Sequence, residues 1–475
     1  MFFVRKFLFF CLLCVSIGSA RDADDIRNDF LRSYHGGNYS RAHDLLRKAF
    51  QNPETIQIWE ERLHLQAQLP GCAFKSEKAT RALALLRIGR IDEAEAQFGQ
   101  DSVSLMGLAT LSLWESDLSR SREYLTQALL KDPDNPELLF LAASIVETDA
   151  EALLYFEKFL QQKSENPLKV LSAKQAVDFL EKTKGKKLNI ANLSTPLESL
   201  KSEYDRGRLL IKGKVDGATN VKLLVDTGAA GLSLEEKDWR PQLISDLMMI
   251  GFGRDKISYG KRVVFDQFSA GNFSLRNAVA AISSNLNAGD VDGVAGSVLF
   301  SDYLVLLPMR SGRAVLLFPP SEQNPLDQLR KIGNEFKTSL TLPFYMINRM
   351  MIVKGRVKRS GEDMDILVDT GAHRSVVSLP TAQRYAHIDY TRGRLGEQTP
   401  QLFGMGGSVV DIRIAENVEV QIGTIKRNFD EMIALNLAEI NEAMEIDLDL
   451  ILGQDFLAGY SLLIDYRNRT LTLLK

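Results

Sequence analysis

The segment LLVDTGA at residues 223–229 occurs again, in closely similar surroundings, as DILVDTGA at residues 365–372. A glycine-centred apolar stretch precedes each copy, LIKGKV at 210–215 and IVKGRV at 352–357. A second matched pair follows, VDGVAG at 291–296 and LDLILG at 448–453. Because the matched stretches keep the same order, the sequence indicates a duplicated domain.

In both copies an Ile/Leu/Val run ends in an aspartate, Asp226 in the first and Asp369 in the second. A carboxylate at the end of such a run lies at the edge of a core, where its charged form is poorly solvated. The glycine that follows, Gly228 or Gly371, permits a close backbone approach that a side chain would block. Two such loops related by pseudo-symmetry would bring Asp226 and Asp369 side by side.

These motifs resemble the pepsin and retropepsin class of aspartic proteases, with both lobes in one chain. The resemblance covers residues 205–475 and includes the hydrophobic-hydrophobic-Gly stretches at 294–296 and 451–453. It implies that Asp226 and Asp369 form a catalytic dyad that shares one proton and activates water for peptide hydrolysis. It also implies that Thr227 and Thr370 join the two loops by hydrogen bonds, and that the reaction uses no cofactor and no metal.

Three other interpretations compete with this one. An isolated Asp-Thr-Gly is more often a strand-to-turn junction. The two lobes could keep the protease fold without hydrolysing peptides and act as a non-catalytic protein-interaction module. A metal hydrolase is the weakest alternative, because the five histidines form no His-Glu-x-x-His motif and no Cys/His cluster.

Two glycine-rich segments are candidates for flaps that cover a bound substrate. Proteolysis needs a lid that excludes water, and such lids carry glycine at a hairpin tip. The first lobe offers Gly251, Phe252 and Gly253, and the second offers Gly404, Met405 and Gly406. A peptide or protein substrate would bind as an extended strand beneath them. The alternative for each segment is a plain β-turn.

Residues 1–20 have the pattern of a secretory signal peptide. Arg5 and Lys6 precede an apolar run at 7–17, and Gly-Ser-Ala at 18–20 suits a cleavage site. The run is short for a membrane span. We therefore expect export to the periplasm or outside the cell, with no membrane span after cleavage; an uncleaved anchor is the weaker alternative.

Residues 21–185 read as helices, with apolar residues at three-to-four spacing. Small residues and turn-forming stops, such as KDPDNP at 131–136, resemble tetratricopeptide repeats with irregular spacing. Such arrays supply a concave surface for peptides or partner proteins. The alternative is that these helices cover or steady the protease lobes.

The expected fold is therefore an N-terminal α-helical repeat array followed by a bilobal all-β domain like that of the acid proteases. The expected parts are a signal peptide at 1–20, helical repeats at 21–185, a linker at 186–204, lobe 1 at 205–318, an inter-lobe linker at 319–338 and lobe 2 at 339–475. With 58 basic and 61 acidic residues, the chain has no positive excess for nucleic acid or anionic lipid. Because one chain supplies both lobes, we expect a monomer.

Overall fold

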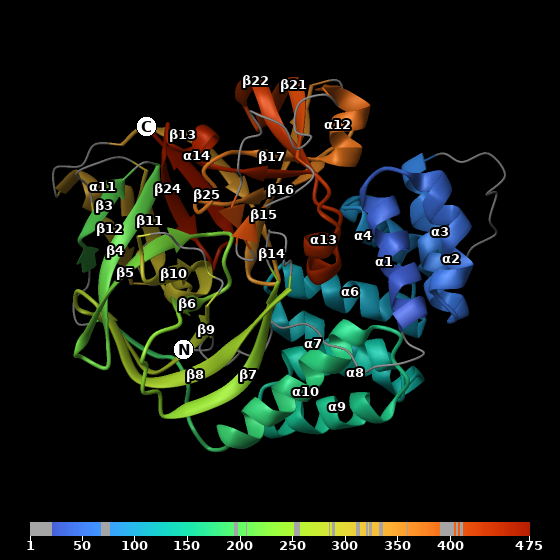
Figure 1. The fold of residues 1–475 in the computed structure, drawn as a ribbon, viewed down its shortest axis with the longest axis horizontal. Helices are drawn as coiled ribbons and strands as arrows, with labels where there is room; N and C mark the ends of the chain where they lie inside the picture. Colours follow the sequence, from blue (N-terminus) through green and yellow to red (C-terminus); the bar gives the residue numbers. More distant parts are fainter. Residues whose placement is uncertain are drawn as a thin grey trace.

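The computed structural model describes residues 21–67, 77–193, 198–205, 207–250, 257–284, 286, 290–309, 314–319, 322, 325–331, 336–358, 360–389, 403–404, 407–408 and 412–475. Helices occupy the first part of this range and β-sheets most of the rest (Figure 1). The proposed signal peptide at 1–20 lies outside the described residues. Within the described residues, none of the helices is long and apolar enough to cross a membrane.

The N-terminal helices are α1 (Arg21–His35), α2 (Tyr39–Ala49), α3 (Pro53–Ala67), α4 (Lys78–Arg87), α5 (Ile91–Glu95), α6 (Ser102–Trp114), α7 (Leu118–Lys131), α8 (Pro136–Ile145), α9 (Asp149–Gln161) and α10 (Pro167–Lys182). Polar caps define several starts: the Asp117 side chain accepts from the backbone N–H of Arg120, and Thr148 forms a capping box with Glu151. Sequence neighbours such as α6 and α7 or α8 and α9 pack together. The expected helical region is thus confirmed, whereas its assignment to tetratricopeptide repeats stays a prediction.

Lobe 1 is built on a sheet in which both ends of a six-strand path meet. The path runs β4, β5, β10, β6, β9 and β8, with each strand pairing with the next, and β8 pairs in turn with β4. The strands are β4 (Arg208–Val215), β5 (Thr219–Asp226), β6 (Leu232–Glu235), β8 (Ile257–Ala270), β9 (Phe273–Ser283) and β10 (Gly293–Gly296). The edge strand β7 (Leu243–Ile250) pairs with β8. This closure surrounds a core that includes the buried side chains of Leu223, Phe265 and Phe268.

Lobe 2 repeats this pairing with the same strand directions. Its path runs β15, β16, β23, β17, β22 and β21, and β21 pairs again with β15. The strands are β15 (Met350–Val357), β16 (Met364–Val368), β17 (Val376–Ser378), β21 (Arg413–Ile422), β22 (Ile425–Leu435) and β23 (Leu450–Leu452). The equivalence of the two paths shows that the duplicated sequence folds into duplicated structure.

A third sheet joins the lobes. Its order is β2-β12-β11-β24-β25-β13, from β2 (Glu198–Leu200), β11 (Leu304–Pro308), β12 (Val315–Phe318), β13 (Thr338–Pro343), β24 (Ser461–Asp465) and β25 (Thr470–Leu474). At its centre β11 of lobe 1 lies antiparallel to β24 of lobe 2, with Leu306 opposite Leu463. The C-terminal hairpins of both lobes therefore form one continuous sheet that fixes how the lobes sit together.

Both expected linkers contain regular structure. The segment 186–204 includes β1 (Ile190–Leu193) and β2, and β3 (Ser202–Asp205) begins within it; these strands pair with β9, β12 and β4 respectively. Its polar composition suits a loop, but open sheet edges supply partners that local sequence does not reveal. The segment 319–338 contains α11 (Pro325–Lys331), and β13 begins at its end. The linkers therefore complete the sheets as well as connecting domains.

The helices pack directly onto the lobes and share their cores. Trp114 and Leu86 are buried with lobe 2 residues such as Ile352, while Phe179 of α10 is buried with Val264 of lobe 1. In Figure 1 the helices run as an arc from α1, which packs against α13 (Ala438–Met444) of lobe 2, to α10, which packs against β7 of lobe 1. The face of the arc toward the lobes is therefore occupied by this chain itself.

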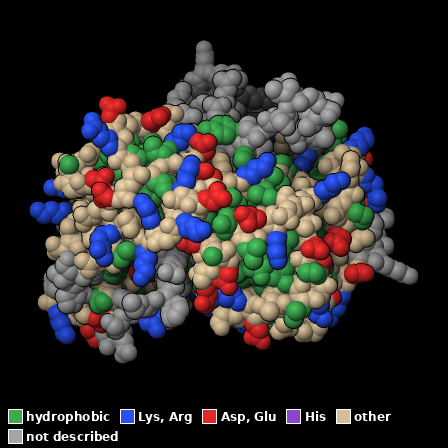
Figure 2. Space-filling model, turned by 90° about the horizontal axis from the view of Figure 1, so that it is seen from below, with side chains coloured by type: hydrophobic (Ala, Val, Ile, Leu, Met, Phe, Trp, Pro, Cys, Tyr) green, Lys and Arg blue, Asp and Glu red, His purple; other side chains and the backbone are tan. Residues whose placement is uncertain are grey.

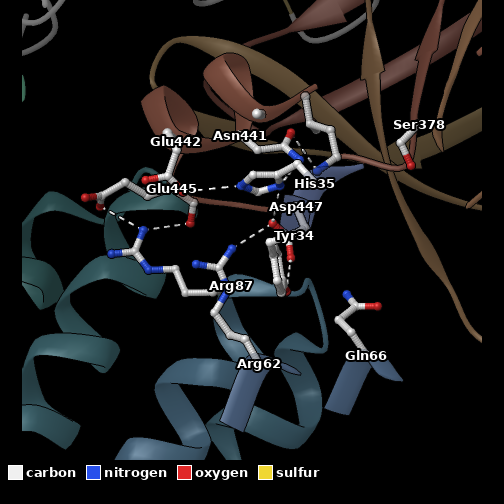
Figure 3. Close-up of polar contacts among 12 residues, drawn as sticks. Tyr34, His35, Arg62, Gln66, Arg87, Ser378, Asn441, Glu442, Glu445 and Asp447 are labelled. Carbon is white, nitrogen blue, oxygen red and sulfur yellow. Dashed lines mark hydrogen bonds and ion pairs between the residues drawn. The ribbon is translucent and has the colours of Figure 1, made fainter. Parts of the chain in front are cut away.

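Polar contacts reinforce this packing on the lobe 2 side (Figure 3). Asp447 accepts hydrogen bonds from the Arg62 guanidinium at 2.8 Å and from the Tyr34 hydroxyl at 2.9 Å. Nearby, Arg87 forms an ion pair with Glu445 at 2.9 Å. Because Arg62 and Asp447 are both largely buried, removing one partner would leave an uncompensated charge. The helices and lobe 2 are thus joined by charge as well as by apolar contact.

Candidate active site

The two Asp-Thr-Gly loops lie at equivalent places in the two lobes. Strand β5 ends at Asp226, which lies opposite Gly296 of the parallel strand β10. Strand β16 ends just before Asp369, whose backbone N–H donates to the carbonyl oxygen of Leu452 at the end of β23. In each lobe, therefore, a parallel pair of buried strands delivers the aspartate to the same edge of the sheet.

Reciprocal hydrogen bonds between the two threonines connect the loops. The Thr370 hydroxyl accepts from the Thr227 N–H at 3.0 Å and donates to the carbonyl oxygen of Val225 at 2.9 Å. The Thr227 hydroxyl likewise accepts from the Thr370 N–H at 3.0 Å and donates to the Val368 carbonyl at 2.6 Å. Thr370 is fully buried and Thr227 nearly so. Each threonine thus satisfies two buried backbone groups, one of them in the opposite lobe's loop and the other in the strand leading to it.

The same geometry brings the two aspartates into contact. A Cβ atom on Gly228 would lie 2.5 Å from Cγ of Asp369, and one on Gly371 would lie 2.4 Å from Cγ of Asp226. Only glycine permits this approach. The Asp226 and Asp369 side chains are linked by a hydrogen bond. The structure thus brings all six residues of the two Asp-Thr-Gly loops together.

The environment of the pair favours one shared proton. Burial, repulsion by Asp369 and the hydrogen bond to Asp369 raise the pKa of Asp226 well above its usual range, against the effect of the Gly228 and Gly371 N–H groups. Burial also raises the pKa of Asp369, against hydrogen bonds from Asp226 and from the N–H groups of Ala372 and Gly371. The Asp369 Oδ1 atom accepts from these two amides at 2.9 and 2.8 Å. Because Asp369 Oδ1 accepts from two backbone amides, whereas Asp226 Oδ1 accepts from the Gly228 N–H at 2.7 Å, we assign the proton to Asp226 and the negative charge to Asp369.

The hydrophobic-hydrophobic-Gly stretches support the loops from behind. A Cβ atom on Gly296 would lie 2.4 Å from the carbonyl oxygen of Ala229, and one on Gly453 would lie 2.7 Å from that of Ala372. Because backbone atoms cannot move aside as a flexible side chain can, these positions require glycine. The motif recognised in the sequence thus has a steric basis.

Other supporting groups in lobe 2 were not anticipated from the sequence. The Asp455 carboxylate accepts from the Ser375 N–H at 2.9 Å and from its hydroxyl at 2.5 Å, and the same hydroxyl accepts from the Gly453 N–H at 3.1 Å. Gln454 bonds to the carbonyl oxygen of Thr370. The available signal was position, since both Gln454 and Asp455 directly follow the glycine of the ILG stretch.

The flap candidates are described only in part. Residues 251–256 lie outside the described residues, but β7 and β8 lead to and from them as an antiparallel pair. In lobe 2, β19 (Phe403–Gly404) pairs with β20 (Gly407–Ser408), while Met405 and Gly406 lie outside the described residues. Both segments thus fall between antiparallel strands, and their action as flaps stays a prediction. Within the described part of the chain, no group of three or more His, Cys, Asp or Glu side chains is arranged to hold a metal ion.

Comparison with known proteins gives independent support for lobe 2. Residues 347–475 match the family model of the retroviral aspartyl proteases. The crystal structure of the aspartic proteinase from Irpex lacteus aligns with a TM-score of 0.37 and 14% sequence identity, covering 58% of this chain and 96% of that chain. Comparison with curated proteins found no match. The family match supports an aspartic protease fold and a protease-like function, and it contains the second Asp-Thr-Gly loop.

Proposed function

We propose that this protein is an aspartic endopeptidase that hydrolyses peptide bonds with water activated by Asp226 and Asp369. The observation that carries the proposal is the hydrogen-bonded pair of carboxyls, delivered by equivalent strands of two lobes. The threonine hydrogen bonds across the lobes support the required rigidity. A hydrolytic dyad needs two carboxyl groups in different protonation states, and the environment described above favours that state.

In the proposed reaction, water attacks the peptide carbonyl carbon while ionised Asp369 takes a proton from that water. Protonated Asp226 donates its proton to the carbonyl oxygen, which gives a neutral diol intermediate. The C–N bond then breaks as Asp369 returns its proton to the amide nitrogen and Asp226 recovers a proton from a diol hydroxyl. The dyad ends in its starting state, and no covalent intermediate forms with the enzyme.

The pH dependence follows from the two protonation states. Activity rises with pH as Asp369 ionises and falls as Asp226 loses its proton, so kcat should have a bell-shaped profile. Because burial raises the pKa of both carboxyls, both limbs should lie above the positions that ordinary aspartates would produce. We treat these limbs as properties of the pair, since coupled groups titrate together.

The decisive experiment measures cleavage of casein and of a quenched-fluorescence peptide library. Asp226→Asn and Asp369→Asn should each reduce kcat by at least about a hundredfold, because each removes one proton-transfer group. The matched control is Asp363→Asn, since Asp363 is exposed and forms a surface ion pair with Arg356 at 2.7 Å. Equal activity in the wild type and both dyad variants would refute the proposal and favour a protein-interaction module.

We also propose that the helical region primarily holds the two lobes in place. Its inner face shares buried cores with lobe 1 and lobe 2, so any partner or substrate that docks on these helices must use the outward face. Acidic and basic side chains are interspersed on the molecular face seen in Figure 2, so neither sign of charge dominates that face. Because one chain contributes both aspartates, a monomer should suffice for activity. We also propose that residues 1–20 direct export of the protein.

A further inference from the structure

Gln454 lies beneath the second Asp-Thr-Gly loop, at the start of the short helix α14 (Gln454–Leu457). It is only 3% exposed, and its backbone N–H donates to the Ala372 carbonyl oxygen at 2.8 Å. A glutamine this deeply buried must have its amide hydrogen-bonded. The partners of that amide therefore indicate what the residue does.

The amide of Gln454 bridges the two lobes. Its Nε2 donates to the carbonyl oxygen of Thr370 at 2.6 Å, and its Oε1 accepts from the Tyr204 hydroxyl at 3.1 Å. The orientation of the amide is determined by chemistry, because a carbonyl oxygen can only accept and the amide nitrogen can only donate. Tyr204 belongs to β3, which pairs with β4 of lobe 1. A lobe 1 side chain thus orients a lobe 2 amide.

The peptide unit that receives this hydrogen bond is the one that contacts Asp369. The carbonyl of Thr370 and the N–H of Gly371 form a single peptide group, and that N–H donates to Asp369 Oδ1 at 2.8 Å. Donation to the carbonyl polarises the peptide and strengthens its N–H as a donor. It also fixes the plane of the peptide, and hence the direction of the N–H. Both effects favour the ionised form of Asp369.

We propose that Gln454 is a positioning residue for Asp369, which it orients and keeps ionised through the Thr370–Gly371 peptide, with Tyr204 holding the Gln454 amide in place from lobe 1. This inference rests on the proposed function, because it assigns Asp369 as the ionised member of the dyad.

Other charged groups near Asp369 also influence its protonation. Asp226 faces it from the lobe 1 loop. His373 and Arg374 follow on its own loop and are exposed, so solvent screens them. From α14, Asp455 is held by the Ser375 N–H and hydroxyl. The test must therefore remove the Gln454 amide without changing any of these charges.

Gln454→Met meets this requirement, since methionine has a similar length but cannot donate to the Thr370 carbonyl. The acid limb of the kcat profile should move to higher pH by about half a unit. At pH values below the midpoint of that limb, kcat should therefore fall about threefold. KM should stay unchanged, because Gln454 is buried beneath the loop and only 3% exposed. Tyr204→Phe should move the limb in the same direction by a smaller amount. The control is Gln421→Met, which removes a similar bond from Gln421 Nε2 to a backbone carbonyl, that of Gly423 at 2.8 Å, on the outer part of lobe 2.

A readout independent of turnover separates this inference from the proposed function. The ¹³C shifts of the carboxyl groups report dyad titration directly, with Asp369→Asn used to identify the signals. A raised first titration step in Gln454→Met, but not in Gln421→Met, would support the role of Gln454 even if the wild type cleaves no peptide. An unchanged titration and acid limb, with only lower thermal stability, would overturn it and leave Gln454 as a purely structural residue.

Discussion

Replacing Thr370 with valine should weaken the junction between the lobes by a predictable amount. Valine has nearly the shape of threonine, so no cavity forms, but the hydroxyl that serves the Thr227 N–H and the Val225 carbonyl is lost. Each buried polar group left without a partner costs about 1–3 kcal/mol. The carbonyl can keep other partners through its second lone pair, so we expect the free energy of unfolding to fall by about 2–4 kcal/mol.

Thr370→Ser provides the comparison that isolates the hydroxyl. Serine keeps both hydrogen bonds and loses one methyl group, which costs about 1 kcal/mol. Thr341→Val tests the effect of the same substitution at the surface, where the Thr341 hydroxyl meets that of Thr472 at 3.0 Å in an exposed position. This control should change the unfolding free energy by less than about 0.5 kcal/mol.

The assay is urea unfolding followed by far-ultraviolet circular dichroism and by tryptophan fluorescence, together with kcat measurements. Thr370→Val should unfold at lower urea than Thr370→Ser and show reduced kcat, because loss of the inter-lobe bonds lets the aspartates move apart. Equal midpoints for the valine and serine variants would refute the reasoning. The threonine network would then be a consequence of lobe contact rather than one of its causes.

Two further predictions concern ion pairs of lobe 2 in which at least one partner is largely buried. Lys354 donates to the buried carboxylate of Asp365 at 2.5 Å, so Lys354→Met should lower the free energy of unfolding by about 3 kcal/mol. Lys358→Met removes an exposed lysine whose ion pair with Glu419 is longer, at 3.5 Å, so its effect should be small. Similar losses for the two variants in calorimetry would contradict this prediction. Ion pairs with Arg87 and Lys169 lower the pKa of Glu445 to about 2 despite burial, so its stabilising contribution is complete above the unfolded-state pKa and disappears as pH falls toward 2. Glu445→Gln should therefore flatten the stability profile between about pH 4.5 and 2, and an unchanged slope in acid-unfolding curves would count against this ion pair.

Much of the site could be predicted because its reactive residues lie in short, repeated motifs. Asp226 and Asp369 each follow an apolar run, and each precedes a threonine and a glycine with local geometric roles. The duplicated order of the motifs predicted two equivalent lobes, which the matched strand pairings confirm. Local signals also located the helical region, since apolar spacing and polar caps act within a few residues.

The strands within the expected linkers and the docking of the helices could not be obtained in this way. The segment at 186–204 is polar and contains a proline, and such a composition is typical of loops. Its strands form because β9, β12 and β4 offer unpaired edges that are remote in sequence. Similarly, the apolar stripe of a helix shows that it packs on something, but it does not identify the surface.

The sequence by itself determined the duplication, the two aspartates and the glycines that let them meet, because these depend on residue type and short-range geometry. Only the tertiary structure decided which groups complete their environment. Tyr204 and Gln454 meet from opposite lobes across most of the bilobal chain, and no periodicity or motif links them. Their contact exists because sheet closure and the shared inter-lobe sheet fix the distance between two folded lobes, and that distance is a property of packing rather than of any segment.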